Sequence, residues 1–254
     1  LSNNIEDYVE NTVGTDNILK AIKESPTVKR TIITSTQYVY KCLEKPFPDH
    51  DDVYKPHTTY GKSKVIAEEL TRKSSLPCCW TIVRPSNIWG PWHMRYPNEL
   101  WKVIDKGFYV HPGRNQVIRT YGYVKNVAYQ IVSIIEAPEN IVNRKTFYLG
   151  DLPLDSYIWL NEISTQLTGK KIVRFPNYFF KNLSIIGDFA RKLNLPFPLY
   201  KERYLNMVGE YFAPTNVTVE QFGLSHPSMK ANVKETLDWV KGEGKAYFEY
   251  WKKK

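Results

Sequence analysis

The apolar positions in the first half of the chain switch repeatedly between a helical and a strand-like spacing. Residues 5–23 place apolar side chains along one helical face, and residues 60–73 have the same period. Two short runs rich in β-branched residues, 31–33 and 80–83, indicate buried strands. The order helix, strand, helix, strand predicts a parallel, doubly wound α/β sheet. The inner face of the first helix is expected to hold Ile5, Tyr8, Val9, Ile18, Leu19 and Ile22.

The second half of the chain continues with more helices and shorter strands. Residues 108–120 alternate loosely around Gly113 and predict short strands or a hairpin. The helix over 124–136 is expected to turn Val127, Ile131, Ile134 and Ile135 inward. Further helices are expected over residues 98–106, 157–168 and 230–239. One strand is expected over 146–149, and another is expected to start at residue 172. From Pro176 the sequence is helical and rich in aromatic residues, with breaks at Pro196 and Pro198.

A tyrosine and a lysine four residues apart, Tyr60 and Lys64, open the second helix. Residues at this spacing lie on one helical face, so the lysine ammonium is expected to lower the pKa of the phenol. A phenol tuned in this way exchanges protons with a substrate hydroxyl. The same spacing recurs at Tyr121 and Lys125, but there it lacks the surrounding pattern described next.

Three hydroxyl residues, Thr34, Ser35 and Thr36, end the first strand. In open α/β sheets, ligands bind beyond the carboxyl ends of the strands, where these residues would lie. The alternative interpretation is turn chemistry, because Ser and Thr often satisfy loop backbone groups.

These features together resemble the extended short-chain dehydrogenase/reductases, and within them the NAD-dependent epimerase/dehydratase group that acts on nucleotide sugars. The segments stand in the order and at the approximate spacing of that family, and the resemblance covers essentially the whole chain. The segments that carry it are residues 34–40 (TSTQYVY), 60–64 (YGKSK), 84–91 (RPSNIWGP) and 118–127 (IRTYGYVKNV).

The resemblance implies a role for each matching residue. Tyr60 would be the acid/base, Lys64 would hold the nicotinamide ribose, and Thr36 would hydrogen-bond the reacting oxygen, with Ser35 as a second candidate. Lys64, Tyr60, Ser35 and Pro85 would contact the cofactor, NAD or NADP. Thr36, Asn87 and Arg119 would contact the substrate, with Arg119 gripping its diphosphate through a planar guanidinium.

The resemblance also implies two domains. Residues 1–92 and 123–151 would form the nucleotide-binding, Rossmann-like sheet, and 93–122 and 152–254 a smaller α+β substrate-binding domain. The family's Gly-rich turn, which holds the cofactor pyrophosphate, has no match among the 13 glycines, so the sheet is expected to be incomplete at its N-terminal side. Two hypotheses stay open: an enzyme or its inactive fragment, and a non-catalytic ligand-binding or scaffold protein of the same fold.

One departure from the family pattern bears on the reaction. Sugar dehydratases carry an acidic pair after the hydroxyl residue, whereas Gln37 and Tyr38 follow Thr36 here. No carboxyl group is then placed to expel a sugar hydroxyl. The sequence favours epimerisation or keto-reduction of a nucleotide sugar, as in polysaccharide synthesis, and does not separate the two.

Composition and charge limit the other function classes. The three cysteines and five histidines have no metal-ligand spacing, so we expect no metal, and reduced thiols suit a cytoplasmic protein. The net charge is +9, but the basic residues look dispersed and no nucleic-acid motif is present. No stretch approaches the length of a membrane-spanning helix, so no membrane partner is predicted.

The helices over 5–23 and 60–73 match the pair through which family members often dimerise, so a homodimer is expected. The alternative is that their outer faces are solvated, which charged residues at Glu68, Glu69 and Arg72 would allow.

Overall fold

The computed structural model describes residues 2–40, 48 and 50–246. The chain divides into two compact units, each assembled from three segments. Unit 1 comprises Leu1–Ile88, Thr120–Pro153 and Phe212–Pro227, and unit 2 comprises Trp89–Arg119, Leu154–Tyr211 and Ser228–Lys254.

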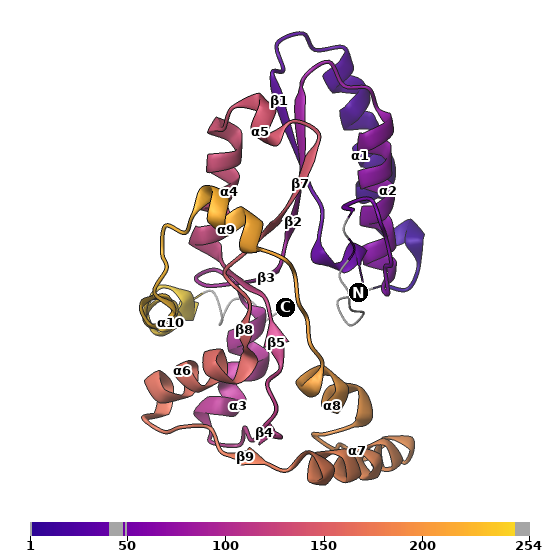
Figure 1. The fold of residues 1–254 in the computed structure, drawn as a ribbon. Coiled ribbons are helices and arrows are strands. Elements are labelled where there is room, and N and C mark those ends of the chain that lie inside the picture. The colour runs from indigo at the N-terminus through magenta and orange to yellow at the C-terminus, as the bar shows by residue number, and fades with distance from the viewer. Residues whose placement is uncertain (1, 41–47, 49, 247–254) are drawn as a thin grey trace. The chain divides into compact units, whose positions relative to one another are not determined.

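Unit 1 is a parallel sheet with helices on both faces (Figure 1). Strands β1, β2 and β7 lie in that order, with Ile33 of β1 opposite Ile82 of β2 and Val83 opposite Phe147 of β7. The elements of unit 1, where η marks a short 3-10 or π-helical turn, are η1 (Ile5–Tyr8), α1 (Val9–Lys23), β1 (Arg30–Thr34), η2 (Gln37–Val39), α2 (Thr59–Lys73), β2 (Cys79–Pro85), β3 (Asn87–Trp89), β6 (Tyr121–Tyr123), α4 (Val124–Glu136), α5 (Glu139–Val142), β7 (Lys145–Leu149) and α9 (Asn216–Phe222).

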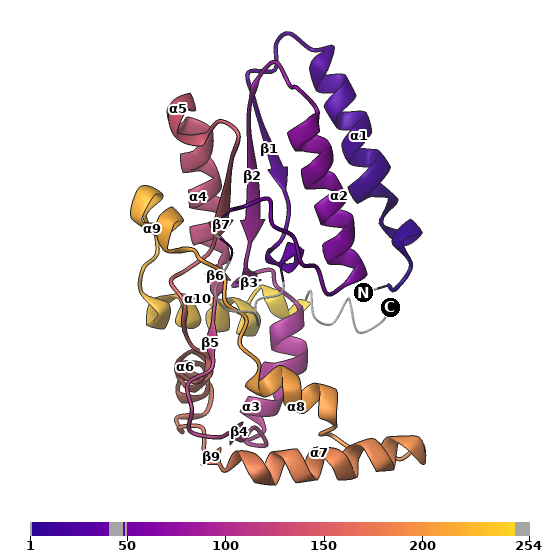
Figure 2. The ribbon, with the colours of Figure 1, turned by 45° about the vertical axis from the view of Figure 1, so that its right-hand side comes forward.

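Strand β2 is buried over almost its whole length because both of its faces are covered. Ile82 packs with Leu19 of α1 on one face, and its neighbour Val83 packs with Ile134 of α4 on the other. Successive side chains of a strand point to opposite faces, so one continuous apolar run serves two cores. Figure 2 shows α1 and α2 on one side of the sheet and α4 on the other. The doubly wound α/β class predicted from the sequence is confirmed.

Unit 2 is built around the indole of Trp159, which is 1% exposed. Its ring centroid lies 5.5 Å from that of Trp89, 5.2 Å from Tyr96 and 6.4 Å from Trp101. Offset and edge-on aromatic pairs of this kind stabilise a small core beyond the area that they bury. The elements of unit 2 are η3 (Pro97–Trp101), α3 (Lys102–Asp105), β4 (His111–Pro112), β5 (Ile118–Arg119), β8 (Leu154–Asp155), α6 (Ser156–Thr168), β9 (Arg174–Phe175), α7 (Asn177–Lys192), α8 (Lys201–Val208) and α10 (Met229–Lys241).

The helix boundaries follow local signals. The Asp155 side chain caps α6 by accepting the Tyr157 amide at 3.1 Å. Gly169 ends the same helix with φ 72°, a left-handed conformation that glycine adopts without steric cost. The predicted helices and strands of both units are present, with shifts of one or two residues at their ends.

Of the two alternatives for residues 108–120, the structure has short strands and no hairpin, because β4 pairs with β9 and β5 pairs with β8. Four residues that were predicted to face inward are exposed: Ile5 at 39%, Val9 at 48%, Ile18 at 57% and Ile135 at 49%. Periodicity identified the helices correctly but overestimated the width of their buried faces.

Residues 212–227 also differ from the expected division, which put them with the substrate-binding part. They pack in unit 1, where the Phe222 ring lies 5.3 Å from Phe147 and the His226 amide donates to Asn126 Oδ1 at 2.7 Å.

None of the helices described by the structure is both long and apolar enough to cross a bilayer.

Candidate active site

One face of α2 carries three polar side chains, Tyr60, Lys64 and Glu68, at intervals of four residues. This spacing stacks them one turn above another. The face lies against the end of β1, and each side chain meets one of the three consecutive residues Thr34, Ser35 and Thr36, as the next paragraphs describe.

Thr36, which is 6% exposed, lies beside the phenol of Tyr60. Burial raises the pKa of Tyr60, the hydrogen-bonding side chain of Thr36 partly offsets this, and the neighbouring phenol of Tyr8 adds to the rise. The Tyr8 and Tyr60 ring centroids are 5.9 Å apart. The structure therefore brings together the predicted acid/base and its predicted hydroxyl partner.

The predicted influence of Lys64 on that phenol is not present. Its ammonium donates to the Thr34 backbone carbonyl at 3.1 Å, and Lys64 is not among the groups that shift the pKa of Tyr60. Burial lowers the pKa of Lys64 itself. Sequence spacing put both side chains on one helical face correctly, but the nearby carbonyl holds the ammonium, so the expected lowering of the Tyr60 pKa is wrong for this structure.

Helix α2 approaches the chain after Thr36 unusually closely, and Gly61 is the reason. A Cβ at Gly61 would overlap the backbone carbonyl of Tyr38. The Thr58 hydroxyl caps the helix at this point by accepting the Gly61 amide at 2.9 Å. The glycine inside the Tyr–Gly–Lys–Ser–Lys motif is thus required by backbone contact, not by an unusual φ angle.

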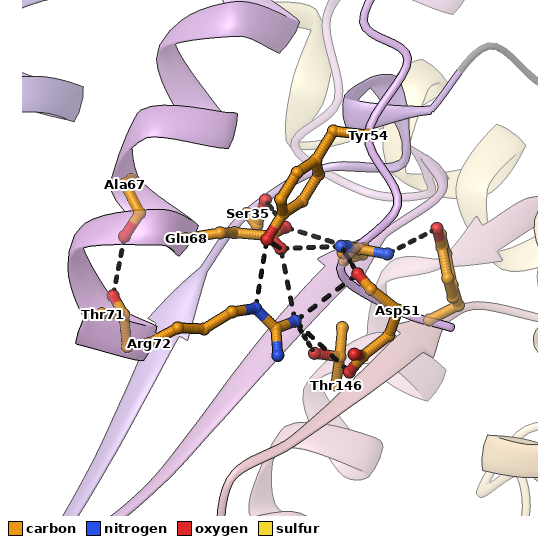
Figure 3. Close-up of polar contacts among 10 residues, drawn as sticks. Ser35, Asp51, Tyr54, Ala67, Glu68, Thr71, Arg72 and Thr146 are labelled. Atoms are coloured by element: carbon orange, nitrogen blue, oxygen red, sulfur yellow. Dashed lines mark hydrogen bonds and ion pairs between the residues drawn. The ribbon is translucent and has the colours of Figure 1, made fainter. Parts of the chain in front are cut away.

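The third residue of the α2 face, Glu68, belongs to a buried ion pair (Figure 3). Its carboxylate accepts Arg84 Nε at 2.8 Å and Arg84 Nη2 at 2.7 Å, and both side chains are at most 1% exposed. Ser35 donates its hydroxyl to the same carboxylate at 2.5 Å, and Tyr54 donates at 3.1 Å. A two-pronged guanidinium–carboxylate contact fixes orientation as well as distance.

The network extends from Glu68 to neighbouring elements. Arg84 Nη1 donates to the Tyr148 hydroxyl at 2.8 Å, and Arg72 donates to Tyr54 at 3.1 Å and to Thr146 at 2.8 Å. Burial, followed by the charge of Glu68, raises the pKa of Tyr54 to about 12, so this phenol stays protonated. Burial by itself would lower the pKa of Arg84, but its bonds to Glu68 and Tyr148 outweigh that effect and raise it.

Neither member of the central pair was recognised as important from the sequence. In the sequence, Glu68 counted only as a charge that would allow a solvated outer face of the helix, whereas it is 0% exposed. The available signal was its position, one turn after Lys64 on the Tyr60 face, which should be buried if Tyr60 faces the sheet. Ser35, proposed as a hydroxyl or cofactor ligand, directs its hydroxyl into this network.

Asn87 and Pro85, the remaining predicted site residues of unit 1, follow β2. Pro85 is the last residue of β2 and is half-buried. Asn87 begins β3, where its side chain donates to the Thr120 carbonyl and accepts from the Tyr38 hydroxyl, both at 3.4 Å. Through Tyr38, Asn87 is linked to the same loop that carries Thr36.

Arg119 belongs to unit 2 and is held by backbone carbonyls there. Its Nε and Nη2 donate to the Gly209 carbonyl at 3.1 and 2.9 Å, and Nη2 also bonds the Asn206 carbonyl at the end of α8. The Tyr211 ring lies under the guanidinium, 5.2 Å away. Two of its nitrogens thus complete the C-terminus of α8.

Gln37, directly after Thr36, is a second residue that the sequence did not single out as a ligand. It is 1% exposed, and neither amide atom has a hydrogen-bond partner among the described residues. A buried amide without partners costs free energy, so a ligand group able to pair with it would be stabilised there. No group of three metal-binding side chains occurs among the described residues.

The chain has relatives of known identity. Residues 1–150 match the NAD dependent epimerase/dehydratase family. Over 154 residues it is 32% identical to the N-acetyl-alpha-D-glucosaminyl-diphospho-ditrans,octacis-undecaprenol 4-epimerase of Escherichia coli O157:H7. That alignment covers 54% of this chain and 46% of the relative, so the match spans about half of that protein's length.

Two solved structures are similar over most of this chain. A UDP-glucuronic acid 4-epimerase from Bacillus cereus, in complex with UDP-glucuronic acid and NAD, superposes with a TM-score of 0.61, 20% identity, and coverage of 92% of this chain and 68% of that one. A UDP-glucose 4-epimerase from Thermotoga maritima with UDP-glucose gives a TM-score of 0.63, 19% identity, and coverage of 93% and 71%. At these identities the likeness establishes the fold.

The buried Glu68–Arg84 pair generates a stability prediction. Glu68→Gln removes the charge that balances a buried guanidinium, so the free energy of unfolding should fall by about 3–5 kcal/mol. The exposed neighbour provides a matched control, because Glu69→Gln should change it by less than about 0.5 kcal/mol. Urea denaturation followed by circular dichroism measures both. Equal stability of the two variants would contradict the assignment, and the double variant Glu68→Leu with Arg84→Met should recover most of the loss.

The Thr36–Tyr60 hydrogen bond generates a second prediction. Thr36→Val removes the hydroxyl that lowers the pKa of Tyr60 while burial stays, so that pKa should rise further above its ordinary value. Nuclear magnetic resonance titration of ring-labelled tyrosine, with Tyr60→Phe for assignment, measures it. Thr36→Ser keeps a hydroxyl and should behave like the parent; identical pKa values in the Val and Ser variants would exclude the hydrogen bond as the cause.

Proposed function

Because the chain belongs to the NAD dependent epimerase/dehydratase family, we propose that it acts on a nucleotide sugar, by epimerisation or by keto-reduction. The observation that carries this proposal is the meeting of the α2 face with the end of β1, where Tyr60 lies beside Thr36 and the half-buried Lys64 donates to the Thr34 carbonyl. This is the part of an open α/β sheet where ligands bind. We assign the cofactor and the reacting sugar hydroxyl to these residues of unit 1.

Each of the three residues has a distinct task in this proposal. The Tyr60 phenolic oxygen takes the proton from a sugar hydroxyl during oxidation and returns it during reduction. Thr36 donates to or accepts from the same sugar oxygen and keeps it within reach of Tyr60. Lys64 orients ribose hydroxyls, and its ammonium lowers the pKa of the phenol once it turns from the Thr34 carbonyl towards Tyr60.

The residues present fit one end of the cofactor. A phenol, an ammonium and the buried amide of Gln37 supply hydrogen-bonding groups for the nicotinamide riboside, and Pro85 adds an apolar contact beside them. NAD, or NADP, supplies the hydride acceptor when bound. The 254 residues contain no Gly-rich turn for the pyrophosphate, so we expect this chain by itself to bind the cofactor weakly.

Asn87 and Arg119 are proposed substrate ligands. Arg119 still has one terminal nitrogen, Nη1, without a hydrogen bond among the described residues, and a guanidinium held by carbonyls is preorganised to meet a diphosphate oxygen. Gln37 and Tyr38 stand where an elimination reaction would need a carboxylic acid, which favours epimerisation or reduction over dehydration.

The group attached to the sugar diphosphate differs between the relatives, which gives a second candidate substrate. The solved relatives bind UDP sugars, whereas the relative found by sequence acts on a sugar diphosphate attached to undecaprenol. The second candidate is therefore a polyprenyl diphosphate sugar, converted by the same three residues. Parallel assays with both substrates distinguish the two carriers.

Substitution of the phenol tests the proposed reaction. Tyr60→Phe removes the proton donor and should lower turnover by about 10²–10⁴-fold, while the Kd for NAD rises far less because Lys64 and Gln37 still contact the cofactor. Tyr129→Phe, on the exposed face of α4, is the matched control and should keep full turnover. Turnover is measured by quenching the reaction and quantifying the sugar product, and the Kd is measured by titration with NAD. Full activity in Tyr60→Phe would exclude the acid/base role, and a folded chain that binds no dinucleotide would support the non-catalytic alternative.

We also propose that two copies associate through α1 and α2. The two helices pack together, and α1 presents Val9 and Val13, 48% and 54% exposed, while α2 presents Ile66, 37% exposed. Apolar residues one turn apart form a seam suited to a four-helix interface. Sedimentation velocity should give the mass of a dimer, and Val13→Lys should shift it to the monomer; a monomeric parent chain would rule the interface out.

A further inference from the structure

Helix α7 of unit 2 has two faces of different character. Its inner face buries Phe180, Ser184 and Gly187, and at Gly187 a Cβ would overlap the Leu199 carbonyl. The segment that contains Leu199 therefore returns onto α7. It continues into α8, which packs on α7 in both views (Figures 1 and 2). The opposite face, which we call the α7 apolar face, consists of Tyr178, Phe179, Ile185, Ile186, Phe189 and Leu193.

The α7 apolar face is open to solvent, and one polar residue, the exposed Asn182, lies within it one turn from Tyr178 and from Ile186. Its residues recur at intervals of three, four and seven, so they line one side of the 16-residue helix over about 24 Å. Each is between 48% and 70% exposed, with Tyr178 at 70% and Phe189 at 65%. A contiguous exposed patch of large apolar side chains marks an interaction site, unlike scattered single residues.

The same region has a local excess of positive charge. Residues 170–203 contain eight basic and two acidic residues, a net charge of six in a chain whose net charge is nine. The other 27 of the 35 basic residues are spread over the rest of the chain. Lys181 and Lys192 are exposed, lie three turns apart and flank the α7 apolar face on the same side.

We propose that the α7 apolar face docks on a membrane surface that contains anionic lipids. A helix with aromatic and aliphatic residues on one face and lysines along its border lies in the plane of the interface, with its apolar side among the acyl chains and its ammonium groups at lipid phosphates. The prediction of no membrane partner rested on the length needed to span a bilayer, and a helix lying in the interface needs no such length.

Charge and composition favour this occupant over other partners. Lysine is depleted at protein–protein interfaces, whereas here it borders the apolar residues. Nucleic acid would use the cations and aromatic rings, but would leave Ile185, Ile186 and Leu193 without an apolar environment. A lipid surface satisfies both the aliphatic residues and the two lysines on one border of the face, where Asp188 is the single acidic residue. The proposal does not rest on the Tyr60 chemistry, because it concerns a separate helix in unit 2.

Flotation of the full 254-residue chain with lipid vesicles tests the proposal. The parent should float with vesicles of phosphatidylcholine and phosphatidylglycerol, and less with phosphatidylcholine alone. Ile186→Ser with Phe189→Ser should lower the partition coefficient by about tenfold for each residue. Lys181→Gln with Lys192→Gln should lower it by about fivefold for each residue on the anionic vesicles only. Added salt should weaken binding of the parent.

The matched control is Val132→Ser with Ile135→Ser on α4, where both residues are 49% exposed. This variant should float like the parent, and circular dichroism checks that all variants are folded. Absence of parent flotation, or equal flotation of every variant, overturns the proposal. The proposal is also overturned if the parent chain is a dimer without vesicles and Ile186→Ser with Phe189→Ser dissociates it. It is overturned as well if the parent chain binds single-stranded oligonucleotide and does not bind vesicles. None of these readouts needs NAD or turnover, so they are separate from the test of Tyr60.

Discussion

The bidentate ion pair between Glu68 and Arg84 is the contact on which the candidate active site depends. It joins α2 to β2 in the buried interior of unit 1, and the Ser35 hydroxyl ties the end of β1 to the same carboxylate. A buried charge without its partner is costly, so the pair tolerates little displacement of either element. Since Tyr60 and Lys64 lie on the same face of α2 as Glu68, their positions relative to Thr36 and Thr34 follow from this contact.

The close approach at Gly61 complements the ion pair at the other end of the helix. There the backbone of α2 touches the Tyr38 carbonyl, so the loop with Thr36 and Gln37 is pressed against the first turn of the helix. The helix is thus held at two points, by backbone contact near Tyr60 and by charge near Glu68. Tyr60 directly precedes the first of these contacts, so the helix holds the proposed acid/base residue in place beside Thr36.

Unit 2 is stabilised by aromatic packing. Its core is a cluster of indole rings around Trp159, which leaves α7 at the periphery with only one face buried. The other face remains apolar, with two lysines along one border. Relatives of this chain act on or bind sugar diphosphates, and under the proposals made above a lipid-binding α7 would bring unit 2 to a membrane surface. The proposed catalytic residues lie on α2 of unit 1, and the proposed membrane contact lies on α7 of unit 2.

The sequence by itself determined the helices and strands, the parallel α/β class, and the Tyr60, Lys64 and Thr36 motif, because periodicity and short-range spacing are local properties. Three features depended on the tertiary structure. The β4–β9 and β5–β8 pairings, the burial of Glu68 against Arg84, and the Lys64 contact with the Thr34 carbonyl each involve partners distant in the chain. A charged residue looks the same in sequence whether water or a guanidinium surrounds it, and only packing decides which of the two it meets.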